Sequence, residues 1–169
     1  MRILGIDPGY ERLGIAVLER NTEATCPSGR RGPQGKEKVI FSECFKTSAK
    51  LEFSERLHLI GTEVNKVIGK YKPEVLAIET LFLNTNQKTV MKVAEARGVV
   101  IYEASCAGLK IFEASPPQIK IATTGYGKAN KEQIKKMVKI LVDIDNSKKS
   151  DDELDAIAIA LTAFACLRV

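Results

Sequence analysis

Several residue types are absent or scarce in this 169-residue chain. It has no tryptophan, one histidine (His58) and four widely separated cysteines, Cys26, Cys44, Cys106 and Cys166. Without a C-x-x-C pair or a second histidine, neither a zinc site nor a disulfide framework is indicated. No apolar run approaches the roughly 18 residues of a membrane span, and no signal-peptide pattern opens the chain. We therefore expect a cytoplasmic protein with reduced thiols and no membrane contact.

Positive charge is in excess and is concentrated in one segment. The chain has 26 basic and 21 acidic residues, which gives a net charge of +5. Residues 110–139 alone hold seven lysines against two glutamates, a surplus as large as that of the whole chain. Such a cluster favours an anionic partner such as nucleic acid, and a solvated surface is the alternative.

Apolar patterning predicts an α/β fold with a five-stranded mixed sheet flanked by helices, all within a single domain over residues 1–169. An antiparallel meander is the simplest arrangement of the first three β-rich runs, at 2–7, 13–19 and 38–47. The segment of about 21–38, rich in glycine, proline and charge, is expected to be a flexible hairpin loop.

The rest of the chain alternates between helical and strand-like patterns. Helices are expected at 52–71, at about 86–105, within 116–125, over 130–144 and from Ser150 onward, with strands at 74–80 ("EVLAIET") and 109–115. Asn130 with Gln133, and Ser150 with Glu153, have the spacing of capping boxes at the starts of the last two helices.

Two acids stand at strand ends. Asp7 closes the first strand before a Pro-Gly turn, and Glu79 closes the fourth. Because side chains alternate along a strand, Gly5 shares a face with Asp7, and Ala77 with Glu79. We expect these small residues to leave open space beside each acid. A turn-forming role is the ordinary alternative for Asp7.

Two further acids lie in the last helix. Asp152 and Asp155 are three residues apart and share a face, whereas Asp151 is explained by the favourable placement of acids in a first helical turn. Asp155 leads into the apolar run "AIAIALTAFA", which predicts a buried helix. A carboxylate at the edge of such a helix must be solvated, paired or bound to a metal ion.

Convergence of the four acids would require a positive partner. Two like charges about 4 Å apart cost on the order of 4 kcal/mol at an effective dielectric constant near 20. All-oxygen ligation without a histidine or cysteine pattern favours Mg²⁺ or Mn²⁺, and a pair of such ions is used for in-line phosphodiester hydrolysis.

Five segments, in order, carry a family resemblance. They are "GIDPGYERLGIAV", "LAIETLFLNTN", "EARGVVI", "GYGKANKEQIKKMV" and "DELDAIAIA". Together they resemble the RuvC family of Holliday-junction resolvases, with a ribonuclease-H-like fold. The resemblance implies a structure-specific endonuclease of recombination and repair that makes paired cuts in a four-way DNA junction. It also implies a branch-migration motor complex as a partner.

The resemblance also implies roles for particular residues. Asp7, Glu79, Asp152 and Asp155 match the acidic tetrad that holds Mg²⁺ or Mn²⁺, two ions per active site. Lys120 and Lys131 match lysines that contact the scissile DNA region, and Phe82 matches an aromatic that helps to open or stack on bases at the crossover.

A second DNA contact is predicted from the segment "TTGYGKANK" itself. Gly125 and Gly127 permit close backbone approach to a phosphate, and the following helix N-terminus near Asn130 can donate N–H groups. Lys128 and Lys131 add positive charge to the same segment.

Three other functions share part of this sequence pattern. Actin-like or sugar-kinase ATPases share the opening strand-turn-strand, but they need a second domain that this length excludes. A YqgF-type RNA-processing nuclease also begins with an acidic turn but usually lacks the third and fourth segments above. A non-catalytic junction-binding protein would tolerate the loss of one acid, yet all four acids are present.

A C2 homodimer is expected because a four-way junction has approximate two-fold symmetry and needs two related cuts. Within the predicted helix of about 86–105, the segment 87–104 has apolar residues on more than one side, so one side is expected to pack on the sheet and another to face a second copy. The apolar set is Val90, Met91, Val93, Ala94, Val99, Val100 and Ile101.

Overall fold

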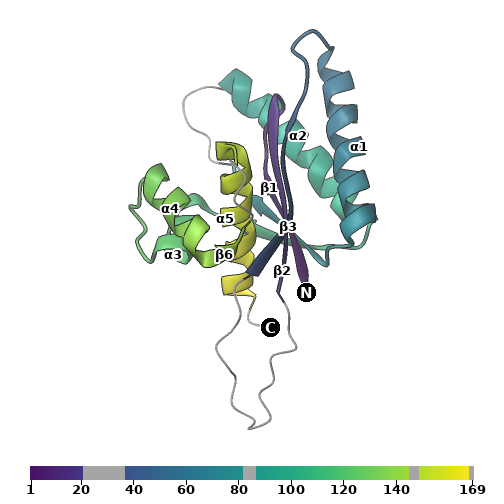
Figure 1. Ribbon diagram of the computed structural model, residues 1–169. Helices are drawn as coiled ribbons and strands as arrows, with labels where there is room; N and C mark the ends of the chain where they lie inside the picture. Colours follow the sequence, from purple (N-terminus) through teal and green to yellow (C-terminus); the bar gives the residue numbers. More distant parts are fainter. Residues whose placement is uncertain (21–36, 82–86, 145–148, 168–169) are drawn as a thin grey trace.

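The computed structural model describes residues 1–20, 37–81, 87–144 and 149–167 (Figure 1). The predicted hairpin loop of about 21–38 therefore lies outside the described residues, except for Glu37 and Lys38, which belong to a strand. Phe82 also lies outside them.

A mixed sheet forms the centre of the molecule. β1 (Arg2–Asp7), β2 (Arg12–Glu19) and β3 (Glu37–Lys46) make the predicted antiparallel meander. β4 (Val75–Glu79) runs parallel to β1, and β5 (Lys110–Ala114) runs parallel to β4. Among the described residues the strand order is β5-β4-β1-β2-β3-β6.

The described sheet has six strands, not the five expected. The additional strand, β6 (Val142–Asp143), pairs with β3 through Glu37 and Lys38. The sequence pattern predicted that the preceding helix extends to residue 144. In the structure this helix, α4 (Lys131–Leu141), ends before β6. The residues expected to extend α4, Val142 and Asp143, instead pair with β3, a strand about a hundred residues earlier in the chain.

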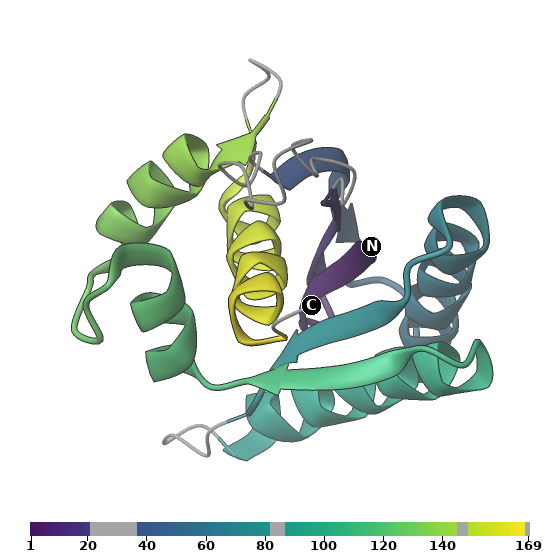
Figure 2. The same ribbon diagram turned by 90° about the horizontal axis from the view of Figure 1, so that it is seen from below.

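Helices cover both faces of the sheet. α1 (Phe53–Tyr71) and α2 (Gln87–Cys106) lie on one face, and α5 (Asp151–Cys166) lies on the other, with α3 (Pro116–Thr124) and α4 outside α5 (Figure 2). The predicted capping boxes at Asn130 and Ser150 are both confirmed. In the part of the chain described here, no helix has the length and apolar character needed to cross a membrane.

Each face of the sheet has its own core, which decides where the strand acids point. Ile3 and Ala77 are fully buried against α5, whereas Leu4 and Ile6 are fully buried against α1 and α2. Because side chains alternate along a strand, Asp7 shares the α5 face with Ile3. The sheet therefore directs this carboxylate towards α5.

Glycines let α5 lie directly on the sheet. A Cβ atom at Gly5 would stand 2.2 Å from the carbonyl oxygen of Ala156, and one at Gly14 would stand 2.2 Å from that of Asp152. The expectation of open space beside Gly5 was wrong, because the backbone of α5 fills it. This close approach brings the first turn of α5 against the end of β1.

Candidate active site

The four predicted acids come from three elements that meet at one end of the sheet. Asp7 ends β1 and Glu79 ends β4, and these parallel neighbours pair up to Ile6 and Ile78. Asp152 lies in the first turn of α5, and its backbone contacts Gly14 of β2. Asp155 follows one turn later.

Electrostatic coupling shows that the acids are neighbours. Burial, and then repulsion from Asp155, Glu79 and Asp152, raises the pKa of Asp7 to about 7, although Lys131 opposes the shift. Burial and Asp155 likewise raise the pKa of Glu79, again against Lys131. The two strand acids therefore sit in an environment that disfavours their ionised forms.

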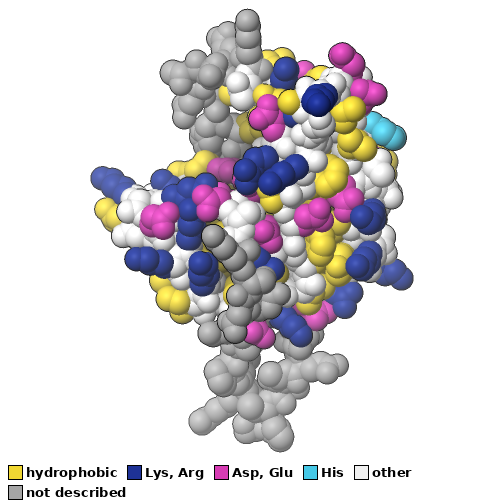
Figure 3. All heavy atoms as spheres, turned by 45° about the horizontal axis from the view of Figure 1, so that its top comes forward, with side chains coloured by type: hydrophobic (Ala, Val, Ile, Leu, Met, Phe, Trp, Pro, Cys, Tyr) yellow, Lys and Arg dark blue, Asp and Glu magenta, His cyan; other side chains and the backbone are white. Residues whose placement is uncertain are grey.

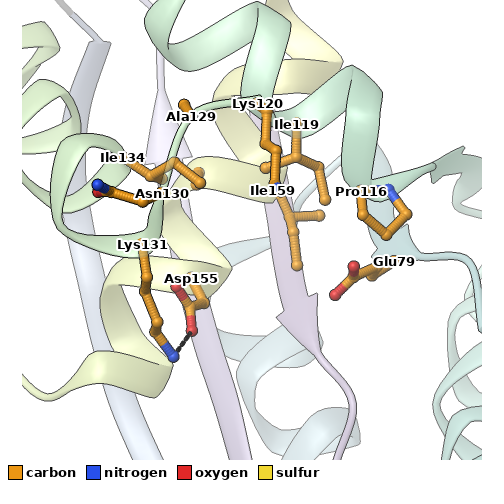
Figure 4. Close-up of a pocket in the computed structure, with 11 residues that line it drawn as sticks. Glu79, Pro116, Ile119, Lys120, Ala129, Asn130, Lys131, Ile134, Asp155 and Ile159 are labelled. Carbon is orange, nitrogen blue, oxygen red and sulfur yellow. Dashed lines mark ion pairs between the residues drawn. The ribbon is translucent and has the colours of Figure 1, made fainter. Parts of the chain in front are cut away.

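The two predicted site acids on α5, Asp155 and Asp152, are both paired with cations. Lys131 Nζ lies 2.8 Å from Asp155 Oδ2 (Figure 4). Arg12 donates to Asp152 Oδ2 from Nε at 2.9 Å and from Nη2 at 2.5 Å, and Cys44 Sγ lies 3.2 Å from the same oxygen. Burial alone would raise the pKa of Asp152, but the bonds from Arg12 and Cys44 outweigh it and lower the pKa.

Asp151 has different surroundings from its neighbour Asp152. Its side chain is 58% exposed and pairs with Lys135 at 2.9 Å, on the α4 side of the helix. Within the described residues, no three histidine, cysteine, aspartate or glutamate side chains are placed to hold one metal ion as they stand.

A pocket of about 280 Å³ adjoins two of the acids. Its polar wall contains Glu79, Asp155, Lys120, Lys131 and Asn130, and its apolar wall comes from α3, α4 and α5. Figure 4 shows Lys131 directed at Asp155, with Glu79 across the pocket. The pocket therefore offers lysine side chains to an anionic group beside the carboxylates. On the wider surface viewed in Figure 3, basic and acidic side chains are interspersed.

Other predicted contact residues lie away from the pocket wall. Gly125 caps the C-terminus of α3 with a left-handed backbone, φ 72°, which glycine adopts without strain. Gly127 and the exposed Lys128 follow in the connection to α4. None of these three is among the residues that line the described pocket.

Sequence reasoning missed three residues that contact the acids or their backbone. Arg12 and Cys44 both contact Asp152. Arg97 on α2 donates from Nε to the backbone oxygen of Glu79 at 3.0 Å and pairs with Glu113 on β5. Arg97 belongs to the "EARGVVI" segment, but no local sequence pattern reveals its contact with Glu79, 18 residues earlier.

Known proteins resemble this chain along most of its length. The family model for crossover junction endodeoxyribonuclease RuvC matches residues 3–163. The RuvC of Halothermothrix orenii is 40% identical over 161 residues, which covers 95% of this chain and 90% of the relative.

Solved structures agree with the sequence comparison. Thermus thermophilus RuvC has a TM-score of 0.82 at 31% identity, covering 96% of this chain and 92% of that one. The same protein in complex with Holliday junction substrate gives a TM-score of 0.83, with the same identity and coverage. The expected α/β, ribonuclease-H-like fold is confirmed.

Proposed function

Because this chain belongs to the RuvC family of crossover junction endodeoxyribonucleases, we propose that it resolves four-way DNA junctions by cutting them at its acidic site. It is a structure-specific endonuclease of DNA recombination and repair. The observation that carries this function is the match over residues 3–163, which spans every segment that supplies an acid. The solved relative bound to a Holliday junction has the same fold over nearly the whole chain.

The alternative functions are not favoured. A YqgF-type RNA-processing nuclease and a non-catalytic junction-binding protein were both compatible with part of the sequence pattern. The relatives that cover 95% of the chain are instead named crossover junction endodeoxyribonuclease RuvC.

We propose that Asp7, Glu79, Asp152 and Asp155 hold divalent cations, Mg²⁺ or Mn²⁺, with two ions per site. The donor set fits, since all four ligands are carboxylates, which hard cations prefer. The raised pKa of Asp7 supports the proposal, because burial and then repulsion from three acids disfavour its ionised form, and a bound cation would relieve the repulsion. When bound, such ions supply activation of water and stabilisation of the leaving oxygen.

The lysines of the pocket are proposed to hold DNA. Lys120 and Lys131 line the pocket beside Glu79 and Asp155. A DNA phosphate would lie between these two lysine side chains and the acids. Gly125, Gly127 and Lys128 would extend this contact along the α3–α4 connection. Phe82, outside the described residues, is proposed to act on bases at the crossover.

We propose a C2 homodimer through the outer side of α2. Met91 and Tyr102 on this helix are 60% and 65% exposed, and a groove between α1 and α2 adjoins Tyr102. Val100, one of the apolar residues in the predicted patch, faces the core and is fully buried. Large exposed apolar side chains on one helix favour an interface.

Three wider expectations rest on the sequence and the family resemblance and stay proposals. They are a single nuclease domain over residues 1–169, a cytoplasmic location, and a meeting with a branch-migration motor complex.

A cleavage assay tests the proposed function. The full chain is incubated with a synthetic four-way junction, a linear duplex of the same sequence and a single-stranded RNA, each with Mg²⁺ or with EDTA. We expect paired nicks in the junction alone, and only with Mg²⁺. Preferential cleavage of RNA, or junction binding without any nick, would support one of the alternatives instead.

A further inference from the structure

We propose that Arg12 and Lys131 are resident counter-ions of the acidic site, which hold Asp152 and Asp155 until DNA phosphate draws the two cations away. Binding of metal and binding of DNA are then coupled through these side chains. The inference rests on the proposed function, in which both α5 acids bind metal. It adds a role for Arg12, a residue outside the acidic tetrad and the family-matched lysines.

The contacts at Asp152 leave one of its oxygens saturated. Oδ2 accepts from Arg12 Nε and Nη2 and lies 3.2 Å from Cys44 Sγ, so three donors surround it. A carboxylate oxygen has about two lone-pair positions. No position on Oδ2 remains for a metal ion while Arg12 is in place, and metal binding through this oxygen must displace the arginine.

Asp155 is held in a similar way from the other side. Lys131 Nζ, on α4, lies 2.8 Å from its Oδ2, whereas Arg12 comes from the start of β2. Asp152 and Asp155 therefore each have their own cation, and the two cations belong to different elements. Displacing one cation leaves the other acid paired.

Exposure decides which partner of each pair can move. The side chains of Arg12 and Lys131 are 51% and 56% exposed, whereas those of Asp152 and Asp155 are 23% and 26% exposed. The long side chains of Arg12 and Lys131 can turn towards solvent without repacking the core, but the acids are fixed on the buried helix α5. An arginine fork also matches phosphate geometry, so a nearby DNA backbone is a suitable alternative partner for Arg12.

The consequence is reciprocal coupling. If phosphate takes Arg12 and Lys131 from the acids, DNA increases the affinity of the site for metal, and metal must increase the affinity for DNA by the same factor. Without DNA, the paired cations keep metal affinity low.

The first test measures Mn²⁺ binding to the full chain without DNA. Removing the arginine in Arg12→Ala should tighten binding at least about fivefold, the lower end of usual coupling between sites. Arg12→Lys, which keeps the charge, should stay closer to wild type. Lys135→Ala is the matched control, because Lys135 pairs with Asp151 and Glu132 rather than with a proposed ligand.

Two results would overturn the inference. One is Mn²⁺ binding by Arg12→Ala that is no tighter than wild type. The other is an equal gain in Lys135→Ala, which would reduce the effect to general electrostatics. Asp155→Asn, measured in parallel, reports on the metal site itself. If that variant binds Mn²⁺ as wild type does, the proposed metal site fails and this inference fails with it.

A second test asks whether Arg12 contacts a DNA phosphate when the junction is bound. Junction affinity is measured in EDTA over a range of salt concentrations for wild type and Arg12→Ala. Losing one phosphate contact should reduce the slope of log affinity against log salt by about 0.9. An unchanged slope would contradict transfer of Arg12 to the DNA backbone.

Discussion

Asp7 illustrates, at the scale of one residue, how an acidic site costs stability. Its pKa rises from 3.8 to about 7 through burial and three neighbouring acids. Between these values the folded protein keeps a proton that the unfolded chain releases, so stability falls as pH rises through this window. Above pH 7 the whole penalty is present, on the order of a few kcal/mol.

We therefore predict that Asp7→Asn stabilises the metal-free protein. In EDTA at pH 8 its Tm should exceed that of wild type by several degrees, and the gain should be smaller at pH 5, where Asp7 is already protonated in the folded state. Thermal unfolding at the two pH values measures this. Asp7→Asn with a lower Tm at pH 8 would contradict the proposed repulsion.

At the scale of elements, the site depends on how closely α5 approaches the sheet. Gly14→Ala would place a methyl group against the Asp152 carbonyl, where no space exists. We predict a loss of about 1–3 kcal/mol or more in unfolding free energy, together with impaired cleavage, because α5 carries two of the acids.

The matched control for this change is Gly69→Ala. Gly69 lies in α1 with nothing within 4 Å of an added Cβ atom. Alanine there should stabilise the helix by roughly 0.5–1 kcal/mol and leave cleavage unchanged. Urea unfolding gives both free energies. Similar behaviour of the two variants would show that the contact at Gly14 does not position α5.

The contact between α2 and β4 gives a second prediction at this scale. Arg97 holds the backbone oxygen of Glu79. Arg97→Ala should lower cleavage about tenfold or more by loosening the end of β4, since small misplacements of reacting groups are costly. Arg97→Lys should restore part of the rate. Junction affinity measured in EDTA should stay near wild type in both variants, and a parallel loss of affinity would indicate a direct DNA contact instead.

Local signals allowed most elements to be predicted. The capping boxes at Asn130 and Ser150 involve residues three apart, so the sequence pattern contains both partners. The positions of Asp7 and Glu79 at strand ends were also predicted, because alternation and turn residues are local signals. The features that were not predicted depend on partners distant in the sequence. β6 forms by pairing with β3, the space beside Gly5 is filled by the backbone of α5, and Arg12 binds an acid 140 residues away.

At the scale of the whole molecule, paired cuts require two active sites. We predict that Tyr102→Glu converts the proposed dimer into an 18.6 kDa monomer, because a charge would be buried in the α2 interface. Ile140→Glu on α4 changes a similarly exposed apolar residue away from α2 and should leave the dimer intact. Sedimentation at micromolar concentration distinguishes them, and a monomeric wild type would contradict the proposal.

The central claim, that four particular acids cut the junction, is tested most directly by two neighbouring residues. Asp152→Asn should lower junction cleavage by at least about a thousandfold, equivalent to roughly 4 kcal/mol, while junction binding persists. Asp151→Asn removes the same charge from the adjacent position, which pairs with Lys135, and should cleave within a few-fold of wild type. Cleavage rates of the two variants on one labelled four-way junction provide the measurement. Near-normal cleavage by Asp152→Asn, or equal loss in both variants, would contradict the account.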